Sequence, residues 1–74
     1  MSNKLAVNDI KDISNAEISA AIDNYVRGER DRAIMKRRLI DCITYERLAE
    51  EFNLSVRQVK NIVYRHEITV FRHI

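Results

Sequence analysis

The sequence predicts an all-α fold, a bundle of four helices or of five, from its composition and from the spacing of its apolar residues. Hydrophobic residues make up 46% of the 74 residues and charged residues 32%, with one glycine and no proline. This composition is typical of a compact helical chain and not of a β-sandwich or a disordered tail. We expect one small domain over residues 14–74, preceded by a flexible segment over residues 1–13, where no apolar period is sustained.

The first two helices are predicted on either side of the single glycine. Ser14 and Glu17 have the spacing of a capping box, which marks the start of the first helix. We expect Gly28 to close this helix and a second helix to cover residues 29–41. The apolar stripe of the first helix consists of Ile18, Ala21, Ile22, Tyr25 and Val26, and the inner face of the second consists of Ala33, Ile34 and Ile40.

Two further helices are predicted in the second half of the chain. Thr44 is expected to cap a helix over residues 45–52, and Ser55 a helix that starts at Val56. The fourth helix keeps helical spacing as far as the last residue. Its β-branched residues Ile68, Thr69 and Val70 lower helix propensity, so we expect it to end either near His66 or at the end of the chain.

The third and fourth helices have the residue spacing of a helix-turn-helix. Leu48 and Phe52 lie on one face of the third helix, and Val59 and Ile62 lie on one face of the fourth. Three further residues suit the junction. The small Ala49 permits a close crossing, Asn53 tolerates a left-handed conformation where the chain leaves the helix, and Leu54 fills the turn. The alternative interpretation is an ordinary helical hairpin, but a hairpin does not require these three residues.

The basic residues fall into two blocks. Residues 27–38 carry a net charge of +4 and residues 57–74 a net charge of +3, and the two remaining segments are acidic. Positive charge on the fourth helix and on the helix before the motif is expected for a surface that meets phosphates. The alternative for the first block is a solvated amphipathic helix with internal ion pairs. The first basic block contains Arg27, Arg30, Arg32, Lys36, Arg37 and Arg38, and the second contains Arg57, Lys60, Arg65 and Arg72.

The outward face of the fourth helix carries side chains that suit DNA. Arg pairs with the guanine edge, and Gln or Asn with the adenine edge, so Arg57, Gln58 and Asn61 are the predicted base contacts. The alternative is an ordinary solvated helix face, since these residue types are common on surfaces. Other residues are predicted to hold phosphates, which fixes register without reading sequence. The predicted phosphate contacts are Arg37, Arg38, Ser55, Lys60, Tyr64 and Arg65.

Other classes of function have little support in the sequence. His66, His73 and Cys42 lack the close ligand pairs that zinc requires, so we expect no metal site. No phosphate-binding glycine loop or nucleophile-and-base pair is present, so we expect neither an enzyme nor a cofactor. No apolar run approaches the roughly 20 residues that cross a bilayer. With a lone cysteine and no leader sequence, we expect a cytoplasmic protein. The aromatic residues are too scattered along the chain for a base-stacking platform.

The stretches Glu29–Arg38 and Ile43–Lys60 resemble region 4 of bacterial sigma-70-type factors and the related small helix-turn-helix proteins of phages and prophages. The resemblance covers about two thirds of the chain. It implies DNA binding through the fourth helix, with Arg57, Gln58, Lys60 and Asn61 at the positions where the family meets the major groove. It also implies that basic residues of the preceding helices contact the DNA backbone. Because the sequence has no room for the sigma region that melts the promoter, we expect a stand-alone regulator and not a complete sigma factor.

Two hypotheses of function follow. The first is a small transcriptional regulator that binds duplex DNA in the major groove. The second is a protein-interaction module that docks on RNA polymerase, on a sigma factor or on a second copy of itself. The second depends on the resemblance and on an apolar tail with no assigned partner, formed by Ile68, Val70, Phe71 and Ile74. Pairing of two copies would place two half-sites about one turn of DNA apart.

Overall fold

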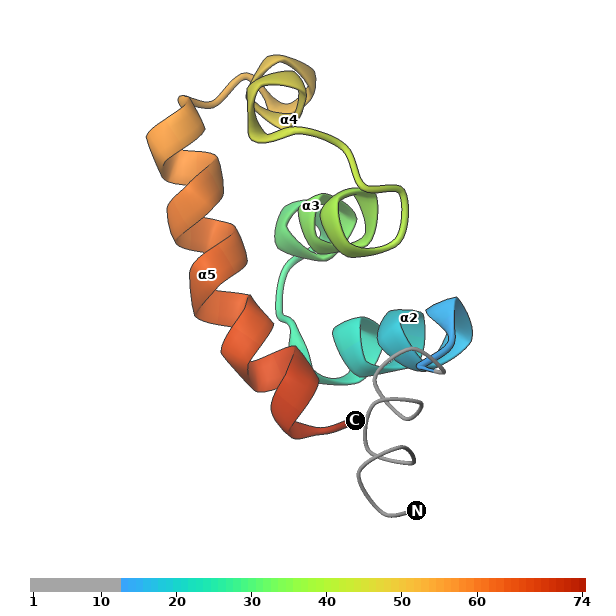
Figure 1. Ribbon diagram of the computed structural model, residues 1–74. Helices are drawn as coiled ribbons and strands as arrows, with labels where there is room; N and C mark the ends of the chain where they lie inside the picture. Colours follow the sequence, from blue (N-terminus) through green and yellow to red (C-terminus); the bar gives the residue numbers. More distant parts are fainter. Residues whose placement is uncertain (1–12) are drawn as a thin grey trace, which may run out of the picture.

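The structure, a computed structural model, describes residues 13–74, which form four helices and no strand (Figure 1). The predicted all-α fold and its four helices are therefore confirmed for this part of the chain. The predicted flexible segment, residues 1–13, lies outside the described residues except for Ile13. The helices are α2 (Asn15–Tyr25), α3 (Glu29–Leu39), α4 (Tyr45–Phe52) and α5 (Val56–Arg72).

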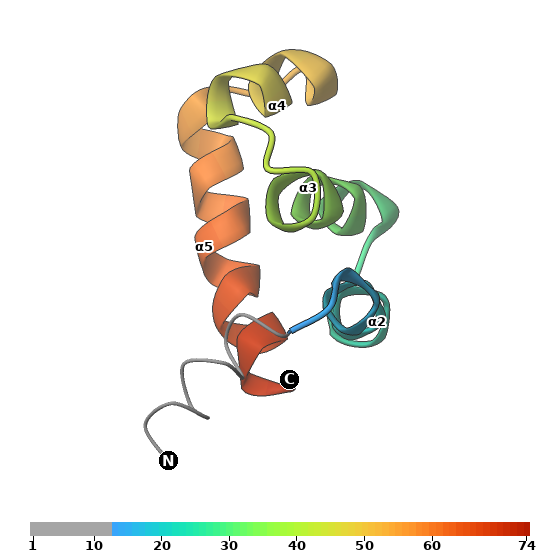
Figure 2. The same ribbon diagram turned by 45° about the vertical axis from the view of Figure 1, so that its right-hand side comes forward.

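Helix α5 is the element against which the others pack. It contacts α2, α3 and α4, and these three are stacked along its length in the order α4, α3, α2 (Figures 1 and 2). Every helix contributes fully buried side chains to one core, and each such side chain typically stabilises the fold by about 1.5–3 kcal/mol. The largest fully buried side chains are Ile22, Val26, Ile34, Met35, Leu48, Val59, Val63 and Val70.

Three helices begin at the predicted caps. The hydroxyl groups of Ser14, Thr44 and Ser55 each accept a hydrogen bond from the backbone N–H three residues further on. A cap of this kind typically contributes about 1 kcal/mol, because it satisfies an N–H that has no partner within the helix. The complete capping box is at Ser55, where the Gln58 side chain also accepts from the Ser55 N–H at 2.9 Å.

Gly28 has a different role from the predicted one. Helix α2 ends at Tyr25, with Val26 in extended conformation as its C-cap, so the prediction that Gly28 closes the helix is wrong. Gly28 is instead the N-cap of α3, with φ +89° and ψ 131°, a conformation that few residues other than glycine adopt. Val26 is buried, and Arg32 closes the connection by donating a hydrogen bond to the Val26 carbonyl at 3.1 Å.

The inner face of α3 includes one residue that the sequence pattern missed. Ile34 is buried as predicted, but Met35 beside it is also fully buried, whereas Ala33 and Ile40 are only half-buried. The helix lies between α2 and α4 and also contacts α5, so it buries more than one narrow stripe. It ends at Leu39, two residues before the predicted end.

The connection between α4 and α5 has the predicted backbone. Asn53 is left-handed, with φ 54° and ψ 48°, and the Leu54 N–H donates to the Ala49 carbonyl at 2.9 Å. These contacts turn the chain within three residues. Helix α4 thus lies across the N-terminal end of α5 (Figures 1 and 2).

Helix α5 continues well beyond the earlier of its two predicted ends. It runs without a break to Arg72, through the β-branched residues that lower helix propensity. Val70 is fully buried, so its assignment to a free apolar tail is wrong. Packing of the Val70 side chain into the core offsets the unfavourable propensity of this segment. Ile68, Phe71 and Ile74 remain exposed.

Candidate nucleic-acid interface

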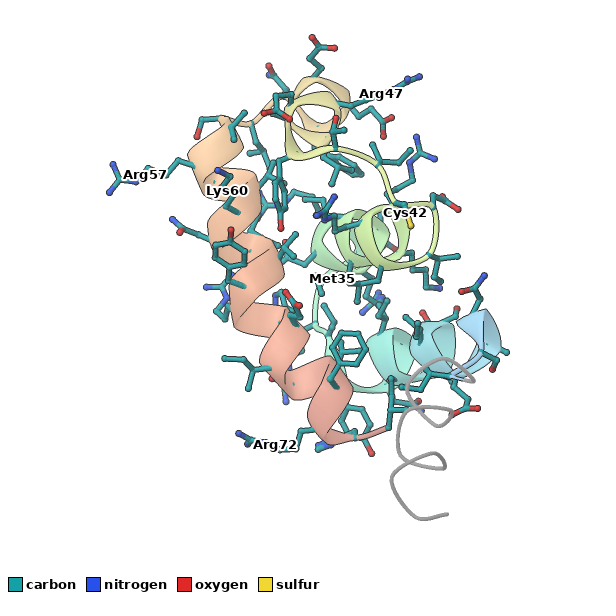
Figure 3. The ribbon with its side chains drawn as sticks, in the orientation of Figure 1. Met35, Cys42, Arg47, Arg57, Lys60 and Arg72 are labelled. Atoms are coloured by element: carbon teal, nitrogen blue, oxygen red, sulfur yellow. The ribbon has the colours of Figure 1, made fainter. Side chains whose placement is uncertain are left out.

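The N-terminal half of α5 has one buried face and one polar exposed face. Val59, Ile62 and Val63 are buried, whereas Arg57 and Asn61, on the opposite side, are exposed. Figure 3 shows Arg57 pointing away from the other helices. The other predicted contacts on this helix, Gln58, Tyr64 and Arg65, are also exposed, and Lys60 is half-buried. All six side chains are therefore within reach of a large ligand on this side of the bundle.

Gln58 and Ser55 serve the helix as well as its surface. The Gln58 N–H donates to the Ser55 hydroxyl oxygen at 3.1 Å, and Gln58 Oε1 accepts from the Ser55 N–H at 2.9 Å. Neither bond uses the Gln58 amide NH₂ group or the Ser55 hydroxyl hydrogen, which are still able to donate. The Ser-x-x-Gln spacing predicts this capping box, but from the sequence only Ser55 was assigned to the cap.

Tyr45 lies at the centre of a cluster with three of the predicted phosphate contacts. The Arg38 guanidinium carbon is 4.2 Å from the centre of the Tyr45 ring, and Lys60 Nζ is 5.6 Å from it. The Tyr64 ring meets the Tyr45 ring edge-on, with 6.2 Å between their centres. The sequence analysis treated Tyr45 and Tyr64 as scattered aromatic residues. They are in contact because α4 packs on the N-terminal half of α5.

Arg37 is held at the surface contact between α3 and α4 by two carboxylates. Its guanidinium donates to both oxygens of Glu51 on α4, at 2.6 and 3.1 Å, and to Asp41 at 3.2 Å. Hydrogen bonding from Arg37 lowers the pKa of Glu51, and hydrogen bonding to Glu51 and Asp41 raises the pKa of Arg37. This two-pronged geometry ties α3 to α4. Arg37 was predicted to contact phosphate. In the structure its guanidinium already donates hydrogen bonds to these two acids.

Arg65 borders a second ion cluster, centred on Asp31. The Asp31 carboxylate lies 2.9 Å from His66 Nε2, 3.1 Å from Arg30 and 3.7 Å from Arg65. Burial raises the pKa of Asp31, but the hydrogen bonds from His66 and Arg30 and their positive charge outweigh it, so the pKa lies below its ordinary value. The Asp31–His66 contact ties α3 to α5. Arg65 itself stays 68% exposed.

The ion pairs leave only part of the positive charge free. Five of the basic residues in the described part of the chain contact a carboxylate, namely Arg30, Lys36, Arg37, Arg47 and Arg65. Three basic residues that contact no carboxylate of the described residues lie at the end of the bundle where α3, α4 and α5 meet, namely Arg38, Arg57 and Lys60. Positive charge without an acidic partner therefore gathers next to the polar face of α5. The remaining basic residues without an acidic partner in this part of the chain are Arg27, Arg32 and Arg72.

Residues 13–74 contain no group of three side chains able to hold a metal ion. His66 is engaged with Asp31, and the His73 ring lies 3.7 Å from the Tyr25 ring. Cys42 is exposed in the α3–α4 connection (Figure 3). Within the same residues, no helix has the length and apolarity needed to cross a membrane.

No protein-family model, curated protein or solved structure matches this chain. The functional argument therefore depends on the chain's own side chains and their arrangement.

Proposed function

We propose that this protein binds duplex DNA through the N-terminal half of α5, with α4 and α5 acting as a helix-turn-helix, and that it regulates transcription. The observation that carries the proposal is the exposed polar face on which Arg57 and Asn61 lie together, opposite a buried face. The major groove is about 12 Å wide and admits one α-helix. Helix α4, which lies across the start of α5, corresponds to the helix that crosses the DNA backbone in such motifs.

The side chains divide into base contacts and phosphate contacts. In the proposed complex Arg57 donates to guanine O6 and N7, and Asn61 pairs with adenine. Gln58 donates through its free NH₂ group, because its Oε1 already accepts from Ser55. Arg37 is assigned to the α3–α4 contact. The proposed phosphate contacts are Arg38, Ser55, Lys60, Tyr64 and Arg65.

The first test is the affinity of the whole chain for duplex DNA, measured by fluorescence anisotropy across a range of salt concentrations. Phosphate binding releases counterions, so the logarithm of the binding constant falls linearly with the logarithm of salt concentration, with a slope of about −0.9 per phosphate. The three cationic contacts, Arg38, Lys60 and Arg65, neutralise two phosphates if two of them share one and three if they do not, so the expected slope lies between roughly −2 and −3. Absent or salt-insensitive binding to every duplex tested would reject the proposal.

The second test is selection of bound duplexes from a random pool, which reports sequence preference and half-site symmetry together. Arg57→Ala is expected to weaken binding to the selected site by about 10- to 100-fold and to relax the preference at one position. Arg47→Ala is the matched control, because Arg47 is also exposed and charged but lies on α4 beside Glu51. Equal losses for the two variants would contradict base reading by Arg57.

A second candidate function is favoured by the C-terminal half of α5. Ile68 is 64% exposed and Phe71 43% exposed. Exposed apolar side chains in a group mark protein contacts more often than isolated ones do. We propose as the alternative that this end of α5 docks on a protein, either RNA polymerase, a sigma factor or a second copy of the chain. If two copies pair here, sedimentation will show a dimer that the Ile68→Asn, Phe71→Asn variant lacks. An unchanged monomer mass would reject self-association.

A further inference from the structure

Four side chains from three helices meet at the Tyr45 ring. Arg38 comes from the end of α3, Tyr45 from the first turn of α4, and Lys60 and Tyr64 from α5. The two cations lie 4.2 and 5.6 Å from the ring centre, within the range of a cation–π contact. Tyr64 stands edge-on against the same ring. Tyr45 is half-buried and Tyr64 is 52% exposed, so the cluster is open to solvent on one side.

The cluster has positive charge and no carboxylate from residues 13–74 in contact with it. Arg37, the neighbour of Arg38 in the chain, contacts two acids, whereas Arg38 contacts none among the described residues. One Arg38 N–H donates to the Ile43 carbonyl at 3.0 Å, which fixes the guanidinium and leaves its other donors free. Lys60 likewise has no acidic partner in the described part of the chain. Two like charges around one ring repel each other, and an anion between them relieves that repulsion.

We propose that Arg38, Tyr45, Lys60 and Tyr64 form one site for a single phosphodiester group of the DNA backbone, with Tyr45 as the positioning residue that holds both cations. This inference rests on the proposed function and names the group of the DNA that this cluster binds. Arg38 and Lys60 supply charge, and the Tyr64 hydroxyl supplies a further donor. Lys60 lies next to Asn61 and one turn from Arg57, so a phosphate bound here lies beside the bases that the polar face would read.

The test compares Tyr45→Leu with Tyr45→Phe in the whole chain. Leu removes the ring and Phe keeps it, so only Leu releases the two cations. For Tyr45→Leu we expect the salt slope to become shallower by about 0.9, the value for one phosphate. We also expect its affinity to fall by about three- to tenfold on specific and non-specific duplexes alike, because the two cations are no longer held in place before the DNA binds. Tyr45→Phe is expected to keep the slope and the affinity of the wild-type chain.

Thermal unfolding monitored by circular dichroism defines the temperature at which each variant is folded, and binding is compared there. Lys60→Met, which keeps the apolar stem and removes the charge, is the second variant if Tyr45→Leu does not fold. It is expected to make the slope shallower by the same amount. A folded Tyr45→Leu or Lys60→Met protein with the wild-type slope would overturn the proposal. So would a Tyr45→Phe protein that behaves like Tyr45→Leu.

A titration with inorganic phosphate, followed by nuclear magnetic resonance of the tyrosine rings, separates this proposal from the proposed function. If the wild-type chain binds no duplex, the proposed function fails. A phosphate-dependent shift of the Tyr45 ring that Lys60→Met abolishes would then support an anion site at the cluster for a free phosphate. The absence of any shift would overturn that site as well.

Discussion

The two basic blocks have similar charge in the sequence and different roles in the structure. In the first block, Lys36 lies 2.8 Å from Asp23 and Arg37 lies 2.6 Å from Glu51, while Arg32 donates to a backbone carbonyl. In the second block, Arg57 and Lys60 contact no carboxylate of the described residues. Three of the six cations of the first block therefore hold helices together, and the start of the second block presents free charge.

This difference shows that net charge per segment is a poor measure of charge available to a ligand. Two of the acids that neutralise the first block come from other helices. Asp23 is on α2 and Glu51 is on α4. Arg38 is the exception, because it turns toward Tyr45 and joins the free charge of α5. The positive charge available to a ligand is thus the charge that no ion pair neutralises.

The largest expected effect is on DNA affinity and is found by removing the same charge from each block in turn. Arg57→Gln, Lys60→Gln is expected to reduce DNA affinity by roughly 100-fold, because it removes a base contact of about 1–3 kcal/mol and a phosphate contact. Its melting temperature should stay near that of the wild-type chain, since neither residue has an acidic partner among residues 13–74. Anisotropy and thermal unfolding measure the two properties.

Arg30→Gln, Lys36→Gln is the matched control with the same loss of charge. We expect a small decrease in melting temperature, because each residue loses an exposed ion pair, and a salt slope close to the wild-type slope. If both double variants lost affinity equally, total charge would matter and the contrast between the blocks would be wrong.

The next effect concerns Asp31, which contacts one cation from each block. Asp31→Ala leaves His66 half-buried without its partner, and we expect the free energy of unfolding to fall by about 1–3 kcal/mol at neutral pH. Asp31→Asn keeps an acceptor for His66 and should lose less. Denaturant titration measures both, and equal loss in the two variants would count against the His66 contact.

The same carboxylate predicts a pH dependence. The pKa of Asp31 is lower in the folded protein than its ordinary value of 3.8. Its contribution to stability is therefore fully present above the ordinary pKa and is lost as the pH falls through the lower, folded value. The wild-type chain should lose stability below about pH 4, where Asp31→Asn should lose less. Parallel pH profiles for the two proteins would contradict this assignment.

A smaller effect is expected at the capping box, where stability and binding can be separated. Ser55→Ala should cost about 1 kcal/mol of unfolding free energy, because it removes the cap of α5. Gln58→Glu keeps an oxygen that accepts from the Ser55 N–H, so the stability should be unchanged. Its negative charge faces the DNA, however, and should weaken binding. A Gln58→Glu chain that binds DNA like wild type would place Gln58 outside the interface.

The smallest expected effect is on the free energy of unfolding, and it tests the structural role of the first block. Arg32→Met keeps the apolar stem and removes the hydrogen bond to the Val26 carbonyl, with an expected cost of about 0.5–1.5 kcal/mol. DNA affinity at a temperature where the variant is folded should not change. A loss of affinity with unchanged stability would show that Arg32 belongs to the binding surface and not to the scaffold.

The features that the sequence predicted correctly are those that depend on near neighbours. Ser14, Thr44 and Ser55 cap the helices as expected, and Asn53 adopts the left-handed turn. Gly28 was misjudged because a glycine marks a special backbone position without saying which helix it serves. Met35 was missed because burial on a second face of α3 depends on how the other helices surround it.

For the candidate site, the sequence predicted which side chains face outward on α5, since helical periodicity decides that. Sequence patterns did not indicate the contacts of Tyr45 with Lys60 and Tyr64, nor the contacts of Arg37 with two carboxylates. Tyr45 lies next to Lys60 and Tyr64 only because α4 packs on α5. Arg37 and Glu51 are 14 residues apart in the chain, a separation at which no periodicity indicates a pair.

The sequence by itself determined the four helices, the capping residues that start three of them and the polar face of α5, because capping and side-chain periodicity act over three or four residues. Only the tertiary structure decided which cations keep their charge free. Polar contacts such as that of Asp31 with His66, 35 residues apart, form when packing brings distant helices together. The free energy that selects them therefore comes from burial of the shared core.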